Sequence, residues 1–173
     1  MLDLSGKVVL VIGLGQSSPS GFGIGSAIAL LLARQGAKIV GGNRIVESAK
    51  ITKDRIEEFK GSCEVYRTDA TSSESVKALV DACILKYGRI DILINNVGKS
   101  EPGDPASMTE DVWDSQVDVN LKGVYLACHH VLPIMKRQGD GRIVSVSSIA
   151  GLRHIGKPQV VYNTTKAAVI HLM

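Results

Sequence analysis

The stretch KVVLVIGLGQSSPSGFGIGSAIALLLARQG, residues 7–36, decides the fold. It opens with a continuous apolar run that ends at Gly13, which is typical of a strand buried on both faces. After a glycine-rich segment, apolar residues recur at helical spacing from Ile24, and Gly36 is placed to end that helix. The stretch therefore predicts the first strand–loop–helix unit of an α/β sheet.

The rest of the chain repeats this alternation. We expect further strands over residues 38–42, 63–67, 90–94 and 142–146, and helices over 46–59, 72–88, 110–137 and from 160 onward. Strands joined by helices predict a Rossmann-type, doubly wound parallel sheet in a three-layer α/β/α domain covering residues 1–173. The strand over 142–146 would then form an uncovered edge that bears Ile143, Val144 and Val146.

Composition restricts the class of protein. Of the 173 residues, 45% are hydrophobic and 21% charged, as in ordinary globular domains. A net charge of +3 is too small to indicate a nucleic-acid or membrane partner. Cys63, Cys83 and Cys128 lack CxxC spacing and no signal peptide precedes them, so we expect free thiols in the cytoplasm. The histidines show no ligand spacing, so we expect no metal site.

The glycine-rich loop is a candidate phosphate site. Gly13 follows the first strand, while Gly23 and Ile24 open the helix, so backbone N–H groups at the positive helix end could hold a pyrophosphate. Nine residues separate Gly13 from Gly23, and the hydroxyl of Ser18 among them could donate to phosphate oxygens. The alternative is a flexible turn that binds no ligand.

The end of the second expected strand bears on the choice of nucleotide. An acidic side chain that would bind the ribose of NAD is absent near Asn43, and Arg44 follows. A guanidinium suits the 2′-phosphate of NADP, so we expect NADP, with NAD as the other possibility. The alternative interpretation of Arg44 is a solvated surface charge.

Several motifs together resemble the short-chain dehydrogenase/reductase family, and the resemblance spans the whole chain. Asn95-Asn96-Val97-Gly98 looks like the family's NNAG element, and Asp69-Ala70-Thr71 looks like its adenine-contacting turn. Further matches are the DVNLKG segment, a Ser-Ser pair ending a strand and a YxxxK signature, which place Asn120, Ser147, Ser148, Tyr162 and Lys166. The resemblance implies that Asn95, Gly98, Asp69 and Ala70 contact the cofactor.

The resemblance also implies catalytic roles. Tyr162 and Lys166 are four residues apart and share a helix face, where the ammonium favours the phenolate. Tyr162 would exchange a proton with the carbonyl oxygen, and Lys166 would also hold the nicotinamide ribose. Ser148 would polarise the carbonyl, with Ser147 structural, although the spacing to Tyr162 is one residue longer than usual in the family. Asn120 would hold a water.

The implied function is interconversion of a small-molecule carbonyl and a secondary alcohol by hydride transfer with NAD(P)(H). Family members continue with two more strands and a substrate-covering segment beyond the helix that carries YxxxK. A truncated, non-catalytic nucleotide-binding or assembly protein is therefore an alternative. A second alternative is an enoyl-thioester reductase, because the spacing from Gly13 to Gly23 resembles that group.

The expected helix over residues 110–137 is apolar on two sides. Together with the helix that starts near Val160, it resembles the family's subunit interface, so we expect a homodimer or homotetramer. We also expect Trp113 to anchor the long helix in the core.

Overall fold

The computed structural model describes residues 3–16 and 21–173. Five parallel strands form one sheet in the order β3-β2-β1-β4-β5. Their bounds are Val8–Ile12 (β1), Lys38–Asn43 (β2), Ser62–Arg67 (β3), Ile92–Asn95 (β4) and Arg142–Ser145 (β5). The order reverses at β1, because β2 and β3 extend to one side of it and β4 and β5 to the other. This arrangement confirms the Rossmann-type doubly wound sheet.

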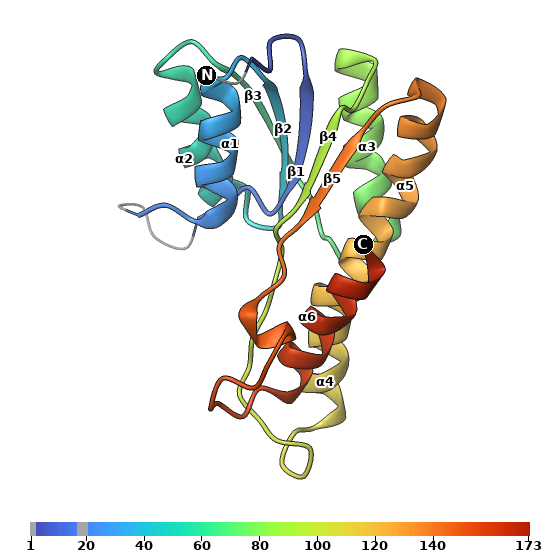
Figure 1. The fold of residues 1–173 in the computed structure, drawn as a ribbon. Coiled ribbons are helices and arrows are strands. Elements are labelled where there is room, and N and C mark those ends of the chain that lie inside the picture. The colour runs from blue at the N-terminus through green and yellow to red at the C-terminus, as the bar shows by residue number, and fades with distance from the viewer. Residues whose placement is uncertain (1–2, 17–20) are drawn as a thin grey trace.

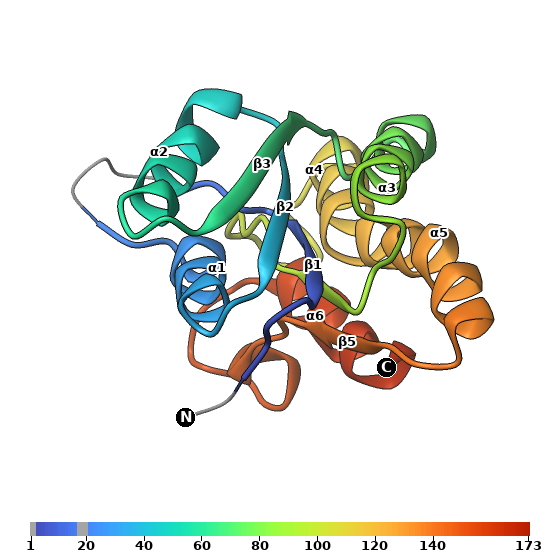
Figure 2. The same cartoon turned by 90° about the horizontal axis from the view of Figure 1, so that it is seen from above.

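Helices cover both faces of the sheet (Figures 1 and 2). The helices α1 and α2 lie against one face, and α3 and α5 against the other. Their bounds are Ile24–Arg34 (α1), Val46–Glu57 (α2), Ser73–Tyr87 (α3), Glu110–Val117 (α4), Gly123–Gln138 (α5) and Val160–Leu172 (α6). The three-layer architecture is therefore the one predicted from the sequence.

The side chains of β1 alternate between two hydrophobic clusters, because successive residues of a strand point to opposite faces. Val9 and Val11 join the cluster that contains Leu30 of α1. Leu10 joins the cluster that contains Val131 of α5. All five residues of β1 are buried, which explains the continuous apolar run in the sequence.

The helical segment from Glu110 is not one regular α-helix. A π-helical turn, Asp118–Lys122 (η1), separates α4 from α5, and Asn120 lies in its middle. The expectation that Trp113 is in the core is wrong, since 40% of its surface is exposed. The reason is that α4 projects beyond the end of the sheet (Figure 1) and buries Gln116 instead.

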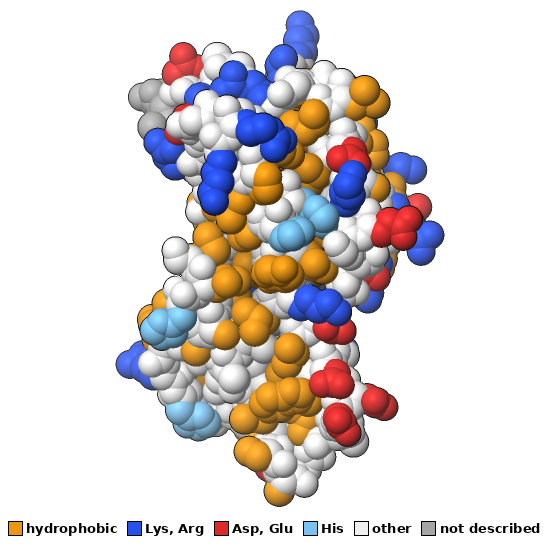
Figure 3. All heavy atoms as spheres, turned by 90° about the vertical axis from the view of Figure 1, so that its right-hand side faces the viewer, with side chains coloured by type: hydrophobic (Ala, Val, Ile, Leu, Met, Phe, Trp, Pro, Cys, Tyr) orange, Lys and Arg blue, Asp and Glu red, His pale blue; other side chains and the backbone are white. Residues whose placement is uncertain are grey.

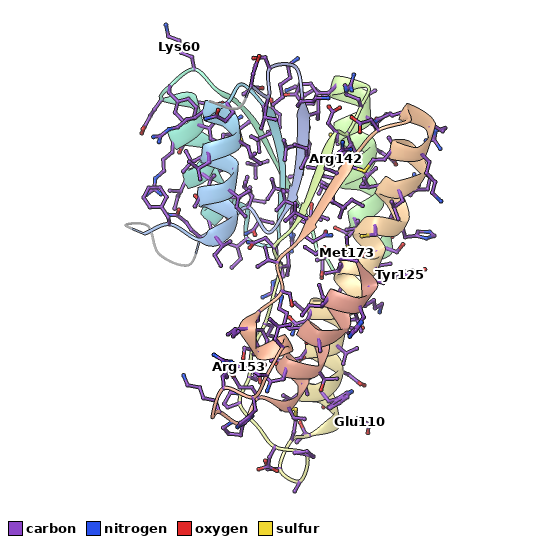
Figure 4. The ribbon with its side chains drawn as sticks, viewed as in Figure 1. Lys60, Glu110, Tyr125, Arg142, Arg153 and Met173 are labelled. Carbon is purple, nitrogen blue, oxygen red and sulfur yellow. The ribbon has the colours of Figure 1, made fainter. Side chains whose placement is uncertain are left out.

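The strand β5 forms one edge of the sheet, as expected. Its Val144 is 49% exposed, whereas Ile143 packs against the hydrophobic cluster that contains Leu10 of β1 and Val131 of α5. In Figure 4, Arg142 at the start of β5 lies on the sheet in the upper part of the molecule, whereas Arg153 lies below the sheet, beside α6. The carboxyl ends of the strands therefore face the part of the molecule that α4, α6 and their loops form.

Candidate functional site

A cavity of about 650 Å³ opens at the carboxyl ends of the strands. Four residues expected to contact a cofactor line it, namely Arg44, Asp69, Ala70 and Gly98. They come from the ends of β2, β3 and β4, which parallel topology brings to one edge of the sheet.

The glycine loop packs closely between β1 and α1. Gly13 has a φ of +93°, and a Cβ there would lie 3.0 Å from Val97. A Cβ on Gly25 would overlap the carbonyl oxygen of Gly13, so the start of α1 lies directly on the end of β1. Helix α1 begins after Gly23 with no side-chain cap and no acidic residue in its first turn. Ile24 and its successors can therefore present N–H groups to an anion, which fits a pyrophosphate.

Ser18, the serine expected to donate to phosphate, lies outside the described residues. Its contribution to a phosphate site stays a prediction.

The side chain of Asn43 is used within the fold. Its Oδ1 accepts a hydrogen bond from the Gly15 N–H (3.3 Å), while its Nδ2 donates to the Ile45 carbonyl (2.7 Å) and to Ser48 Oγ (2.8 Å). The next residue, Arg44, is exposed at the cavity edge. Asn43 thus ties the glycine loop to the start of α2, and Arg44, like Lys99, places a cation at the cavity.

The acidic turn after β3 is ordered by its own hydrogen bonds. Asp69 Oδ1 accepts from the backbone N–H of Thr71 (2.9 Å) and from its hydroxyl (2.8 Å). The Thr71 N–H and hydroxyl hold the pKa of Asp69 below its ordinary value, and the charges of Arg44 and Arg67 add to this effect. Asp69 therefore stays ionised beside the cavity.

Asn120 is fully buried, and its amide is fully used. Its Oδ1 accepts from the Lys99 N–H (2.7 Å), and its Nδ2 donates to the Lys99 carbonyl (2.8 Å) and to Thr165 Oγ1 (3.1 Å). The side chain therefore joins the loop after β4 to α6. Both N–H donors of the Asn120 amide are therefore used within the protein.

Lys166 is buried at the same end of the sheet, with 3% of its surface exposed. Its Nζ donates to the Val146 carbonyl (2.7 Å), and no carboxylate among the described residues forms an ion pair with it. Burial lowers the pKa of Lys166. A Cβ on Gly98 would lie 3.4 Å from Lys166 Nζ and 3.7 Å from Asn120 Oδ1, so these three residues meet.

Tyr162 lies one helical turn before Lys166 on α6, and Lys166 Nζ is 5.8 Å from the centre of its ring. The two adjacent serines differ in their contacts. Ser147 Oγ donates to the Lys166 carbonyl (2.7 Å), which fixes the loop to α6. Ser148 Oγ accepts from the Ala150 N–H (3.2 Å), a contact that does not use its own O–H donor.

The side chain of Asn95, a residue expected to contact the cofactor, joins two strands of the sheet. It is 4% exposed and its Nδ2 donates to Ser145 Oγ (3.0 Å), which joins β4 to β5. It does not appear in the cavity wall, nor do Gly13, Gly23 and Ile24. Ser148, Tyr162 and Lys166 also lie outside this wall.

Several residues of the cavity wall were not among those expected from the sequence. Most are chain neighbours of expected residues, so the motif positions could have indicated them: Gly15, Gln16, Val97, Lys99 and Val119. Ser48 has no such signal, because it reaches the cavity from the first turn of α2.

Two features are absent from the part of the chain that the structure describes. No group of three or more histidine, cysteine or acidic side chains there could hold a metal ion. None of its helices combines the length and apolar character needed to cross a membrane.

Known proteins resemble this chain closely. The 3-oxoacyl-[acyl-carrier-protein] reductase FabG of Thermotoga maritima is 37% identical over 98% of the chain. A short-chain dehydrogenase/reductase structure from Burkholderia xenovorans is 40% identical over 98% of the chain, with a TM-score of 0.95. The chain spans 66% of each of these two proteins.

Two further neighbours carry a nucleotide in their structures. A metagenomic short-chain oxidoreductase in complex with NADP is 32% identical over 98% of the chain (TM-score 0.90), which spans 74% of that protein. An NAD⁺-bound xylitol dehydrogenase is 31% identical over 98% of the chain (TM-score 0.89), which spans 63% of that protein. The family model described as short chain dehydrogenase matches residues 7–173. The chain therefore belongs to the short-chain dehydrogenase/reductase family of oxidoreductases.

Proposed function

We propose that this chain interconverts a carbonyl and a secondary alcohol by using a nicotinamide dinucleotide. The observation that carries the proposal is Lys166, an amine buried beside Tyr162 without an acidic partner among the described residues. A buried amine of this kind is costly for folding, and perturbed buried groups of this kind concentrate at functional sites.

The cofactor would lie along the carboxyl edge of the sheet. The uncapped start of α1 would hold its pyrophosphate, and the cavity at Asp69 and Gly98 would hold its adenosine half. The close packing of Gly25 against Gly13 fits a loop that must admit a ligand to its backbone. When bound, the nicotinamide supplies or accepts the hydride.

The residues of the chain handle the proton and the carbonyl oxygen. Tyr162 donates a proton to that oxygen or removes one from the alcohol, and Lys166 favours the phenolate and holds the ribose. Ser148 polarises the carbonyl with the O–H that its contact with Ala150 leaves available. Ser147 holds α6 in place. Asn120 holds Lys99 and Thr165 through its amide and thereby joins the loop after β4 to α6.

The serine assignment can be tested by replacing each residue. Ser148→Ala should lower kcat by about 10²-fold, in the range of an oxyanion-stabilising donor. Ser147→Ala should act mainly on stability, because its Oγ contacts the α6 backbone. Loss of turnover in Ser147→Ala with normal turnover in Ser148→Ala would reverse the assignment.

We propose that NADP is preferred over NAD. Arg44 is an exposed cation at the cavity edge, and Asn43 is engaged with Gly15 and Ser48. Arg44→Ala should weaken NADPH binding about tenfold, the effect of losing one charge-assisted hydrogen bond, and leave NADH binding unchanged. An unchanged ratio of the two dissociation constants would contradict this preference.

We propose a homodimer or homotetramer that associates through α4, α5 and α6. Hydrophobic side chains gather on this side of the molecule (Figure 3). The exposed hydrophobic residues of α4, α5 and α6 include Trp113, Tyr125, Leu132 and Ile170. Light scattering at micromolar concentration should show a dimer or tetramer, and a monomer would contradict the proposal.

We also propose a reducing, cytoplasmic location. The three cysteines are free, and burial raises the pKa of Cys63 and of Cys83 to about 12. Thiols with so little thiolate react slowly.

The experiment that tests the proposed reaction is an assay of reduced-nucleotide oxidation with ketones, 3-oxoacyl thioesters and enoyl thioesters. We expect turnover with a carbonyl substrate, lost in Tyr162→Phe while NADPH binding persists. Turnover with enoyl thioesters alone would assign double-bond reduction instead. Nucleotide binding without turnover, unaffected by Tyr162→Phe, would favour a non-catalytic nucleotide-binding protein.

A further inference from the structure

Helix α2 contacts the glycine loop at several points along its length. In its first turn, Ser48 lies against Gly15 together with Asn43, the last residue of β2, and a Cβ on Gly15 would be 2.5 Å from Asn43 Nδ2. In its middle, the buried Thr52 Oγ1 lies 3.2 Å from the Leu14 carbonyl oxygen. These contacts hold the first part of the loop, immediately after β1.

Arg55, near the end of α2, contacts two residues of the glycine loop, Gln16 and Gly21. Its Nη1 donates to Gln16 Oε1 (3.0 Å) and to the Gly21 carbonyl (3.0 Å), residues that flank positions 17–20. Its guanidinium carbon also lies 4.5 Å from the centre of the Phe22 ring, a cation–π distance. One guanidinium thus fixes the positions of Gln16 and Gly21 relative to each other and to α2.

The length of the loop explains why such a contact matters. Nine residues separate Gly13 from Gly23, and a longer loop has more conformations to lose when its ends are fixed. Gly21 lies two residues before Gly23, the residue after which α1 begins. A contact that fixes Gly21 therefore also restricts the path of the backbone into the first turn of α1.

We propose that Arg55 is a positioning residue for the pyrophosphate loop. It does not line the cavity, and it acts through Gln16, which does, and through Gly21. The effect on nucleotide affinity rests on the proposed function, whereas the effect on the loop can be measured without nucleotide. The planar fork of arginine suits two acceptors and a ring face together, which a lysine matches only in part.

The test compares Arg55→Met with Lys50→Met, which removes an exposed charge from the same helix. Hydrogen exchange without nucleotide should be faster at Gly21–Ser26 in Arg55→Met and unchanged in Lys50→Met. The dissociation constant for NADPH should rise about tenfold in Arg55→Met, consistent with a lost charge-assisted hydrogen bond. Arg55→Lys should restore part of the affinity.

Gln16→Met removes one of the two acceptors while keeping Arg55, so it tests the proposal even if Arg55→Met folds poorly. Gln16→Met alone should raise exchange at Gly21–Ser26, and adding Arg55→Met should have less than the additive effect. The proposal would be overturned if both single variants showed unchanged exchange and an NADPH dissociation constant within about twofold of wild type. A change that small is less than the loss of one hydrogen bond would cause. Faster local exchange in a protein that binds neither NADPH nor NADH would support the role of Arg55 and contradict the proposed function.

Discussion

Two buried charges lie at opposite ends of the same sheet and are treated in opposite ways. At the amino end, Asp91 is 4% exposed and accepts from the Val8 N–H (2.8 Å) and from Arg89 (2.6 Å), with Lys7 at 3.7 Å. At the carboxyl end, Lys166 is 3% exposed and donates to the Val146 carbonyl, without an ion pair among the described residues. The comparison shows that the fold pairs the Asp91 carboxylate with cations and a backbone N–H, whereas it leaves the Lys166 amine available for chemistry.

The largest expected effect is on turnover at the carboxyl end. Lys166→Met should lower kcat/KM by about 10²- to 10⁴-fold, because proton transfer by Tyr162 loses its cationic neighbour. Lys166→Met removes a buried charge that has no ion-pair partner among the described residues, so it should not destabilise the fold strongly. We expect the free energy of unfolding either to increase or to decrease by less than about 1 kcal/mol. An activity assay and urea unfolding of the same variant check both expectations. Retained turnover would contradict the claim that Lys166 is available for chemistry whereas Asp91 serves stability.

The next effect is on stability at the amino end. Asp91→Ala leaves the buried Val8 N–H without its acceptor, which should lower the free energy of unfolding by about 1–3 kcal/mol. NADPH affinity should not change, because the residue is at the other end of the sheet. Asp140→Ala is the control, as Asp140 also pairs with Lys7 but is 54% exposed. Equal losses in both variants would contradict a special role for Asp91.

The two charges should affect stability in different pH ranges, and in both ranges stability should rise with pH, because both folded-state pKa values are lowered. Burial raises the pKa of Asp91, but the Arg89 and Val8 hydrogen bonds and the charges of Arg89 and Lys7 outweigh it and hold the pKa below the ordinary value. Asp91 therefore stabilises the fold above its unfolded pKa of about 3.9, and this contribution is lost as the pH falls through the lower folded value.

For Lys166, burial lowers the folded pKa, so the unfolded state binds the proton more tightly. Its contribution to stability should rise with pH between the lowered value and the unfolded value of about 10.4. Both contributions can be measured from the free energy of unfolding as a function of pH. Wild type is compared with Asp91→Asn at acidic pH and with Lys166→Met at alkaline pH. Parallel pH profiles for either pair would contradict the assigned shift.

We expect the smallest effect for an exposed ion pair, and it serves as the reference for the effects of the variants at Asp91 and Lys166. Lys77 and Asp81 form an ion pair on α3 at 2.6 Å, and both side chains are 60% exposed. Lys77→Ala should change the free energy of unfolding by about 0.5 kcal/mol or less. A larger loss by urea unfolding would mean that burial is not what distinguishes Asp91.

Sequence patterns predicted the sheet and its covering helices well, because buried parallel strands leave continuous apolar runs such as Val8–Ile12. They could not predict the π-helical turn around Asn120 or the exposure of Trp113. Both depend on how α4 extends beyond the sheet, and local spacing does not encode that (Figure 1).

Motif positions indicated much of the candidate site, including Gly98 and Lys166, which the fold brings together. They could not indicate that Asn43 and Asn95 are used for hydrogen bonds within the fold. Nor could they indicate Arg55, whose partners Gln16 and Gly21 are more than 30 residues away. Such contacts exist only once distant elements pack against each other.

The central claim is that the carboxyl edge of the sheet is a nicotinamide-dinucleotide site built around Lys166. A fluorescence titration of wild type and Lys166→Met with NADPH, and separately with NADH, tests it most directly. We predict saturable binding to wild type, tighter for NADPH, and clearly weaker NADPH binding to Lys166→Met. No saturable binding of either nucleotide, or equal affinity in the two proteins, would contradict the claim.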